Sequence, residues 1–189
     1  MISDLRRLVY TPFTIYYSLM IGRPKPDEAA SYYSIYIDRV TSDDVVGFLT
    51  QQQDEAVAFL KEISEEQSLH RYAADKWSMR ELLGHVNDCE RVFAYRALWF
   101  ARAFPDPLPS FDQEIAVAGA DSDKVSWANL IDEFQSVRAS TIALFRQLPE
   151  EAWSRTGIAS DNPVSVRALA YIMAGHVSHH LAILRERYV

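Results

Sequence analysis

The stretch VRALAYIMAGHVSHHLAILRERY, residues 166–188, places three of the five histidines of the chain inside an otherwise apolar run with helical spacing. On a helix with 100° per residue, His176 and His180 lie about 40° apart, in the middle of the apolar stripe. His179 falls at the edge of that stripe. This segment therefore points two imidazoles toward the interior of the protein.

A third inward histidine comes from KWSMRELLGHVNDCERVFAYRALWFARAF, residues 76–104, where His85 lies at the centre of another apolar stripe. Ser78 followed by Glu81 is a capping box, which predicts that a helix begins there. A buried ring nitrogen without a partner costs about 1–3 kcal/mol. A divalent metal ion would satisfy three such rings together, since a pair of histidines four residues apart and a third from a facing helix can reach one ion.

The sequence leaves a plainer interpretation of these histidines open. A lone buried histidine is usually a core residue with its hydrogen bonds made, and a pair with this spacing also arises by chance. The three rings would then satisfy one another or bound waters. The third inward histidine favours a metal site, for which zinc and nickel are both suitable ions.

Four long segments have the apolar period of a helix, which predicts an all-α four-helix bundle. They span about residues 42–63, 78–104, 126–148 and 165–188. Thr41 or Ser42 is able to cap the first. The connection 105–124 begins with three prolines in five residues and is predicted to be an irregular crossover, and 149–164 contains no convincing strand pattern.

Composition narrows the possible functions. The net charge of −7, without a basic patch, argues against nucleic-acid binding. The sequence has no run of about 18 apolar residues, which a membrane-spanning helix would need. The single cysteine fits a reducing cytoplasm. Residues 1–22 are expected to be an N-terminal extension with little structure over 1–19, and Met20 is expected to be the native start. Residues 23–189 form the predicted domain, with the tyrosine-rich stretch 23–40 as a strap across the bundle.

The two histidine blocks, together with PLPSFDQE at residues 107–114, resemble the DinB/YfiT-like superfamily over about residues 23–189. The resemblance implies a four-helix bundle with crossover connections that holds a divalent ion through His85, His176 and His180. His179 and His70 would not be ligands. It also implies a small-molecule substrate and a homodimer. Some relatives transfer low-molecular-weight thiols, some are thiol-dependent isomerases and others are metal-dependent hydrolases.

Further residues have two interpretations each. Cys89, one turn after His85, is a fourth ligand or reactive thiol or, as we favour, a small core residue. Arg96 and Arg138 interrupt apolar stripes and are interpreted as structural ion pairs, with an anion site as the alternative. Asp88 and Glu90 are candidate acidic partners of these arginines. If the 105–124 connection folds over the open metal positions, Phe111, Asp112 and Glu114 would face a substrate; the alternative is a solvated connection.

The histidine cluster predicts a metal-dependent enzyme, and the family resemblance favours a thiol S-transferase that acts on small electrophiles. No carboxylate is placed as an obvious general base, which favours the thiol reaction over hydrolysis. The alternatives are a metal-dependent hydrolase and a non-catalytic module that binds a metal or a small ligand. No catalytic residue is assigned.

Overall fold

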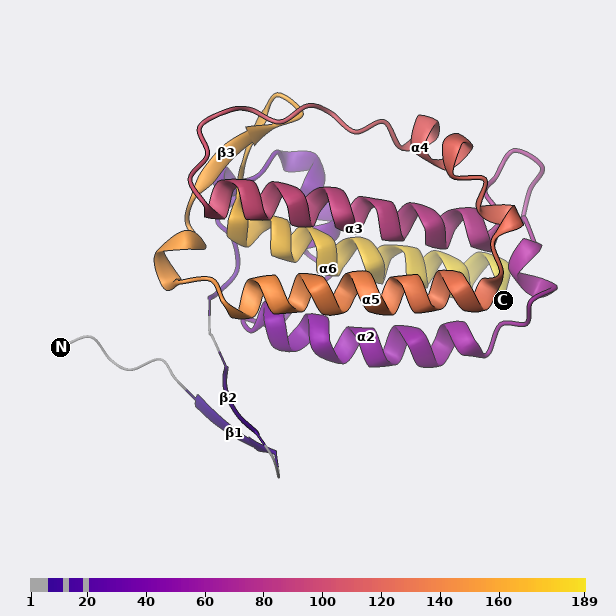
Figure 1. Ribbon diagram of the computed structural model, residues 1–189, viewed down its shortest axis with the longest axis horizontal. Coiled ribbons are helices and arrows are strands. Elements are labelled where there is room, and N and C mark those ends of the chain that lie inside the picture. Colours follow the sequence, from indigo (N-terminus) through magenta and orange to yellow (C-terminus); the bar gives the residue numbers. More distant parts are fainter. Residues whose placement is uncertain (1–6, 12–13, 19–20) are drawn as a thin grey trace.

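The computed structural model describes residues 7–11, 14–18 and 21–189. Its body is a bundle of four long helices, as predicted (Figure 1). These helices are α2 (Val45–Lys61), α3 (Met79–Ala101), α5 (Trp127–Arg146) and α6 (Val166–Ile183). Helices α3 and α2 each pack against both α5 and α6, so α2 and α3 lie at opposite corners.

The connection between α3 and α5 is the crossover of the bundle. It returns along the whole length of α3, so that α3 and α5 run in the same direction (Figure 1). The expectation of an irregular connection over 105–124 is wrong in part, because this segment contains helix α4 (Gln113–Ala120). Asp112 caps α4 by accepting hydrogen bonds from the backbone N–H groups of Glu114 and Ile115.

Serine or aspartate caps fix the starts of the long helices. The predicted capping box of Ser78 and Glu81 is present in full at the start of α3. Ser126 and Ser165 cap α5 and α6 with their side chains, which accept from the backbone N–H groups of Asn129 and Ala168. The prediction for the first helix is wrong, because Asp44 caps α2 by accepting from the backbone N–H of Gly47.

A short antiparallel hairpin joins α5 to α6, contrary to the expectation of no strand in 149–164. Strand β3 (Thr156–Ala159) pairs with β4 (Asn162–Ser165), and Ser160 and Asp161 make the turn between them with φ angles of 52° and 61°. Four residues are too few for an alternating apolar pattern, and the turn lacks the Asn-Gly signal that marks such hairpins.

The tyrosine-rich stretch crosses the bundle, as the strap prediction requires. It contains short 3-10 turns at Pro26–Glu28 and Ser31–Tyr33, followed by α1 (Ser34–Ile37), which packs against α6. Glu28 fastens its beginning by accepting hydrogen bonds from Ser165 and Arg167 at the start of α6. Further single turns lie at Gln67–Leu69, Ser122–Lys124 and Glu150–Ala152, and a π-helical turn, Leu184–Tyr188, follows α6.

Two strands precede the strap. Strands β1 (Arg7–Thr11) and β2 (Thr14–Ser18) pair antiparallel, which corrects the expectation of little structure over 1–19 where those residues are described. Met20, the expected native start, lies outside the described residues. None of the helices in the described part of the chain is long and apolar enough to cross a membrane.

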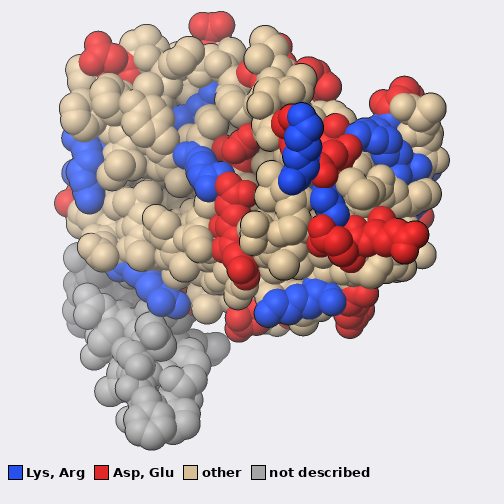
Figure 2. Space-filling view, turned by 45° about the vertical axis from the view of Figure 1, so that its right-hand side comes forward, with Lys and Arg blue, Asp and Glu red and all other residues tan. Residues whose placement is uncertain are grey.

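The core consists of two apolar clusters that follow one another along the bundle axis. One cluster holds Met173 and Ala174 of α6, and the other holds Val177 and Leu181. The boundary between them therefore falls at His176. On the outside, Figure 2 shows acidic side chains in a band down one face, with lysine and arginine side chains between and beside them.

Candidate metal centre

The three histidines predicted as ligands meet between two neighbouring helices. His85 comes from α3, and His176 and His180 come from successive turns of α6. The Nε2 atom of His176 lies 3.1 Å from the Nε2 atom of His85 and 3.1 Å from that of His180. All three side chains offer ligand atoms within 4.8 Å of one another. The structure thus brings these residues together, while His70 and His179 lie outside the cluster.

Burial keeps the three rings neutral. Desolvation lowers the pKa of His85 to about 4 and that of His180 to about 3. The pKa of His176 is lowered well below its ordinary value, first by burial and then by the neighbouring histidines and Arg138. Neutral imidazole is the form that ligates metal ions, so the cluster is ready to bind a cation at neutral pH.

Hydrogen bonds among the rings cannot satisfy this arrangement. A neutral ring nitrogen either donates one hydrogen or offers one in-plane lone pair. Nε2 of His176 faces two other Nε2 atoms and can satisfy only one of them. Nδ1 of His180 is also buried without a partner among the described residues. One cation at the meeting point would take all three lone pairs, so these residues fit a divalent ion.

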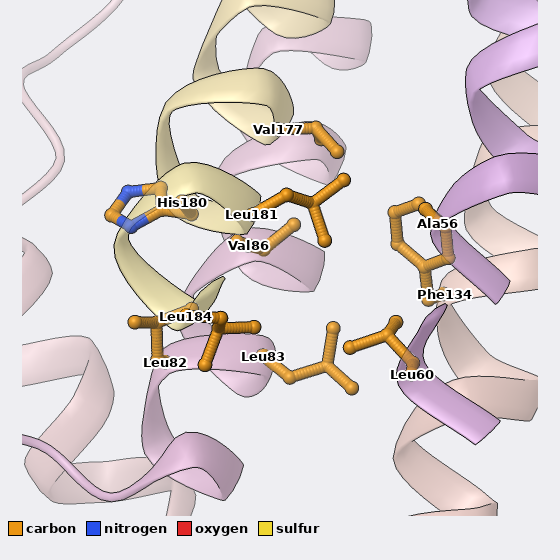
Figure 3. Close-up of a pocket in the computed structure, with 10 residues that line it drawn as sticks. All are labelled: Ala56, Leu60, Leu82, Leu83, Val86, Phe134, Val177, His180, Leu181 and Leu184. Carbon is orange, nitrogen blue, oxygen red and sulfur yellow. The ribbon is translucent and has the colours of Figure 1, made fainter. Parts of the chain in front are cut away.

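The surroundings divide into a dry side and an aromatic side. On the dry side, leucine and valine side chains of α3 and α6 pack together while the His180 ring points away from them (Figure 3). The cavity there has a volume of about 10 Å³, which holds one water at most. On the other side, Tyr36 of the strap stands edge-on against His176, with ring centroids 5.2 Å apart, and Phe93 lies at 6.1 Å.

A buried ion pair links all four long helices next to this cluster. The Arg138 guanidinium on α5 donates two hydrogen bonds to Glu90 on α3, at 2.7 and 2.8 Å, and a third to Gln52 on α2. Gln52 in turn donates to the Ala174 carbonyl and to Ser178 on α6. The prediction of a structural ion pair is confirmed for Arg138, with Glu90 rather than Asp88 as its partner.

The histidine cluster opens on one side into a cavity of about 420 Å³. Its floor is α3 with His176, and its walls are the strap and the start of the crossover. The lining includes Tyr33, Tyr36, Cys89, Phe93, Arg96, Phe111 and Ser160. Of the described residues that line it, none is aspartate or glutamate. Of the three candidates in the connection, Phe111 faces this cavity, whereas Asp112 serves as a helix cap and Glu114 is not part of the lining.

Cys89 and Arg96 are both buried along this cavity. The Cys89 sulfur lies 3.6 Å from Nδ1 of His85, and burial raises the pKa of the thiol to about 12, so it stays protonated in this environment. The ion-pair prediction is wrong for Arg96, because its guanidinium donates to neutral acceptors. These are the Pro109 carbonyl oxygen at 2.9 Å and the Ser160 hydroxyl at 3.1 Å.

Sequence reasoning missed two residues of this site. Tyr36 covers His176, and only the local richness in tyrosine indicated that the strap has a role. Ser160 is 64 positions from Arg96, and no local pattern relates the two. His179 also contacts Tyr36, with ring centroids 5.4 Å apart, at the edge of the stripe where the helical spacing placed it.

Fold and site together define a four-helix-bundle protein with a buried three-histidine cluster that faces a cavity. The model of the DinB superfamily matches residues 49–184, and the chain belongs to this superfamily. No curated protein matches the sequence significantly.

Solved structures share the fold. YfiT from Bacillus subtilis, described as a probable metal-dependent hydrolase with an unusual four-helix bundle topology, is 18% identical with a TM-score of 0.66. The match covers 89% of this chain and 94% of YfiT. A mycothiol-dependent maleylpyruvate isomerase is 12% identical with a TM-score of 0.63, over 77% of this chain and 61% of the isomerase. At these identities the likeness establishes the fold alone.

Proposed function

We propose that this protein is a divalent-metal-dependent enzyme that adds a low-molecular-weight thiol to small electrophiles, with His85, His176 and His180 as the metal ligands. The observation that carries the proposal is the convergence of three Nε2 atoms, in which that of His176 lies 3.1 Å from each of the other two and hydrogen bonds cannot satisfy both contacts. When bound, a divalent ion supplies Lewis acidity, which lowers the pKa of a thiol or a water that reaches it. Zinc and nickel both suit three imidazoles.

The protein's own groups would contribute positioning and a dry environment. Tyr36 and Phe93 shield His176 from solvent, and Trp77 lies against His85 with ring centroids 4.9 Å apart. The Glu90–Arg138 pair holds α3 and α5 in register beside the cluster. Such fixed surroundings keep the three rings in the geometry that a metal requires.

The lining of the cavity favours thiol transfer over hydrolysis. Hydrolysis is usually assisted by a general base beside the attacking water. Among the described residues that line the cavity, no carboxylate is available for that role. The mycothiol dependence of the isomerase with this fold supports a thiol co-substrate.

Metal-dependent hydrolysis is the second candidate, and the description of YfiT as a probable metal-dependent hydrolase favours it. A non-catalytic module that binds a metal or a small ligand is the third. The wider proposal also includes a single domain over residues 23–189, a homodimer, a cytoplasmic location and no nucleic-acid partner.

The experiment that tests this function begins with elemental analysis of the purified protein. Turnover is then measured with a panel of cysteine-derived thiols and 1-chloro-2,4-dinitrobenzene, and in parallel with p-nitrophenyl esters. We expect thiol conjugation that is abolished by chelation and restored by Zn²⁺ or Ni²⁺. The His176→Ala variant should lack this activity, and His70→Ala is the matched control. Ester cleavage alone would select the hydrolase, and metal without turnover the binding module. Equal metal content in wild type and His176→Ala would overturn the metal site.

A further inference from the structure

The geometry points to a carboxylate-binding site at Arg96: the cavity accepts a small molecule with an apolar body, and Arg96 holds its carboxylate about one ligand length from the histidine cluster. The inference that this molecule is a substrate rests on the enzymatic function proposed above. The binding site itself can be tested without turnover.

Arg96 is a buried charge for which the described part of the chain supplies no counter-charge. Its side chain is 5% exposed, and a guanidinium stays protonated in a protein. Its acceptors are the Pro109 carbonyl and the Ser160 hydroxyl, which are both neutral. In the described ranges of the chain, no carboxylate oxygen forms an ion pair with it, whereas the fully buried guanidinium of Arg138 has Glu90.

Two further neighbours of Arg96, Tyr33 and Phe93, are neutral as well. The Tyr33 hydroxyl lies beside it, and burial raises the pKa of that phenol, which therefore keeps its proton. The Phe93 ring lies below the guanidinium, with the central carbon 5.9 Å from the ring centroid. Removing a charge from water without a partner is costly, so an anion that enters the cavity gains a strong, desolvated ion pair.

The backbone around Arg96 holds the guanidinium in place. Ser160 occupies the left-handed region at φ 52°, a conformation that costs a non-glycine residue about 1 kcal/mol or more. The Leu108 backbone pairs with β3 by donating to the Ile158 carbonyl and accepting from the Ser160 N–H, which fixes the adjacent Pro109. A fixed guanidinium loses little freedom when it binds a carboxylate through two parallel hydrogen bonds.

The size and lining of the cavity indicate the body of the ligand. The lining is mostly aromatic and aliphatic, and it includes Tyr32, Ile35 and Phe111, all more than a third exposed. Arg96 and Cys89 are seven residues apart on α3, so the two ends of the cavity are separated by about 10 Å along the helix. A phenyl ring with a three-carbon chain and a carboxylate has this length, and the cavity of about 420 Å³ holds it.

The test uses three probes that share one body and differ in charge: 4-phenylbutyrate, 4-phenylbutanamide and 4-phenylbutylamine. Isothermal titration calorimetry measures their binding to the full-length protein, both metal-free and loaded with Zn²⁺. In metal-free protein the carboxylate should bind at least tenfold more tightly than the amide, and the amine more weakly still. Because no metal is present, this preference cannot come from a carboxylate that ligates the ion.

Variants assign the preference to Arg96. Arg96→Gln should bind the carboxylate and the amide within about twofold of each other, and Arg96→Lys should keep part of the preference. Arg91→Gln is the matched control, because Arg91 is an exposed arginine on the same helix that pairs with Glu133. The comparison of the three probes on wild-type protein tests the carboxylate site by itself, so the test holds even if Arg96→Gln misfolds.

The outcomes separate the carboxylate site from the proposed function. Equal binding of carboxylate and amide to wild type, tighter binding of the amine, or no binding of any probe at millimolar concentration overturns the carboxylate site. A preference that survives in Arg96→Gln overturns its assignment to Arg96. If the carboxylate preference is present and metal-dependent turnover is absent, the site stands and the enzymatic proposal fails. If turnover is present without any carboxylate preference, the enzymatic proposal stands and the site fails.

Discussion

Tyr36 crosses Gly175 so closely that a Cβ atom built on the glycine would lie 1.9 Å from the Tyr36 carbonyl oxygen and 2.4 Å from its carbonyl carbon. The obstructing atoms belong to the backbone, which cannot move aside as a flexible side chain does. The strap can therefore lie on α6 only because residue 175 has no side chain. The contact is one residue from His176, so the glycine also determines how the candidate metal centre is covered.

Gly175→Ala should therefore lift the strap. Alanine favours a helix over glycine by up to about 1 kcal/mol, but the clash should outweigh this gain and lower the free energy of unfolding by about 1–3 kcal/mol. Equilibrium urea denaturation measures the loss. A lifted strap also opens the cavity that Cys89 lines, so the single cysteine should react faster with a thiol reagent such as 5,5′-dithiobis(2-nitrobenzoate).

The matched control is Gly119→Ala in α4, where a Cβ atom meets nothing within 4 Å. This variant should be as stable as wild type or slightly more stable, because only helix propensity changes. Wild-type stability and thiol reactivity in Gly175→Ala would contradict the close passage of the strap.

Removing one charge from the buried pair of Arg138 and Glu90 should strongly destabilise the protein. Arg138 is fully buried and Glu90 is 3% exposed. Glu90→Gln keeps the shape but leaves an uncompensated guanidinium in the core, for which we expect a loss of about 3–5 kcal/mol in the free energy of unfolding. Chemical denaturation provides the measurement. Asp75→Asn, which removes an exposed carboxylate paired with Lys76, should change little, and equal effects of the two substitutions would refute the role of the network.

The long helices and the three histidines are predictable because their signals are local. His85 and His176 lie on apolar stripes whose period alone directs both rings inward, and helices that bury such stripes must pack together. The capping box at Ser78 is likewise contained within four residues. That Arg138 has an ion-pair partner follows from the same reasoning, since a charge inside a stripe requires one, but the stripe does not choose between Asp88 and Glu90.

The features that the sequence did not predict depend mostly on contacts between distant segments. Arg96 donates to Pro109 and to Ser160, 13 and 64 positions away, so no local pattern distinguishes a neutral acceptor from a carboxylate. The β3–β4 hairpin has no clear signal because Ser160 and Asp161 take positive φ angles without glycine. Asp44 caps α2 although two other candidates precede it, and the Ser42 hydroxyl instead accepts from the Asp44 backbone N–H.

Stability of the metal-free protein should fall in mild acid. Burial lowers the pKa of His85 to about 4, whereas the same ring in the unfolded chain titrates near 6.5. Between these values the unfolded state binds a proton that the folded state does not, so the free energy of unfolding decreases as pH falls. The expected slope is about 1.4 kcal/mol per pH unit for each such ring between pH 6.5 and 4, and no loss from these rings is expected above pH 6.5.

Urea denaturation of chelator-treated protein at pH 7.5, 6.0 and 5.0 checks this dependence. The His180→Leu variant lacks one of the rings, so its stability should fall less steeply over the same range. Identical slopes in the variant and wild type would show that His180 does not resist protonation in the folded protein.

His180→Leu should also separate stability from metal binding. Nδ1 of His180 is buried without a partner among the described residues. Leucine removes the unsatisfied group, so the metal-free variant should unfold at the same free energy as wild type or at one up to about 1 kcal/mol higher.

The metal-loaded proteins should behave oppositely. An ion present at a hundred times its dissociation constant stabilises wild type by about 2.7 kcal/mol, and the variant should gain little. Thermal unfolding with chelator, Zn²⁺ or Ni²⁺ measures both effects, with His179→Leu as the matched control on the same helix turn. A metal-induced rise in Tm that survives in His180→Leu but disappears in His179→Leu would move the metal to a different set of ligands.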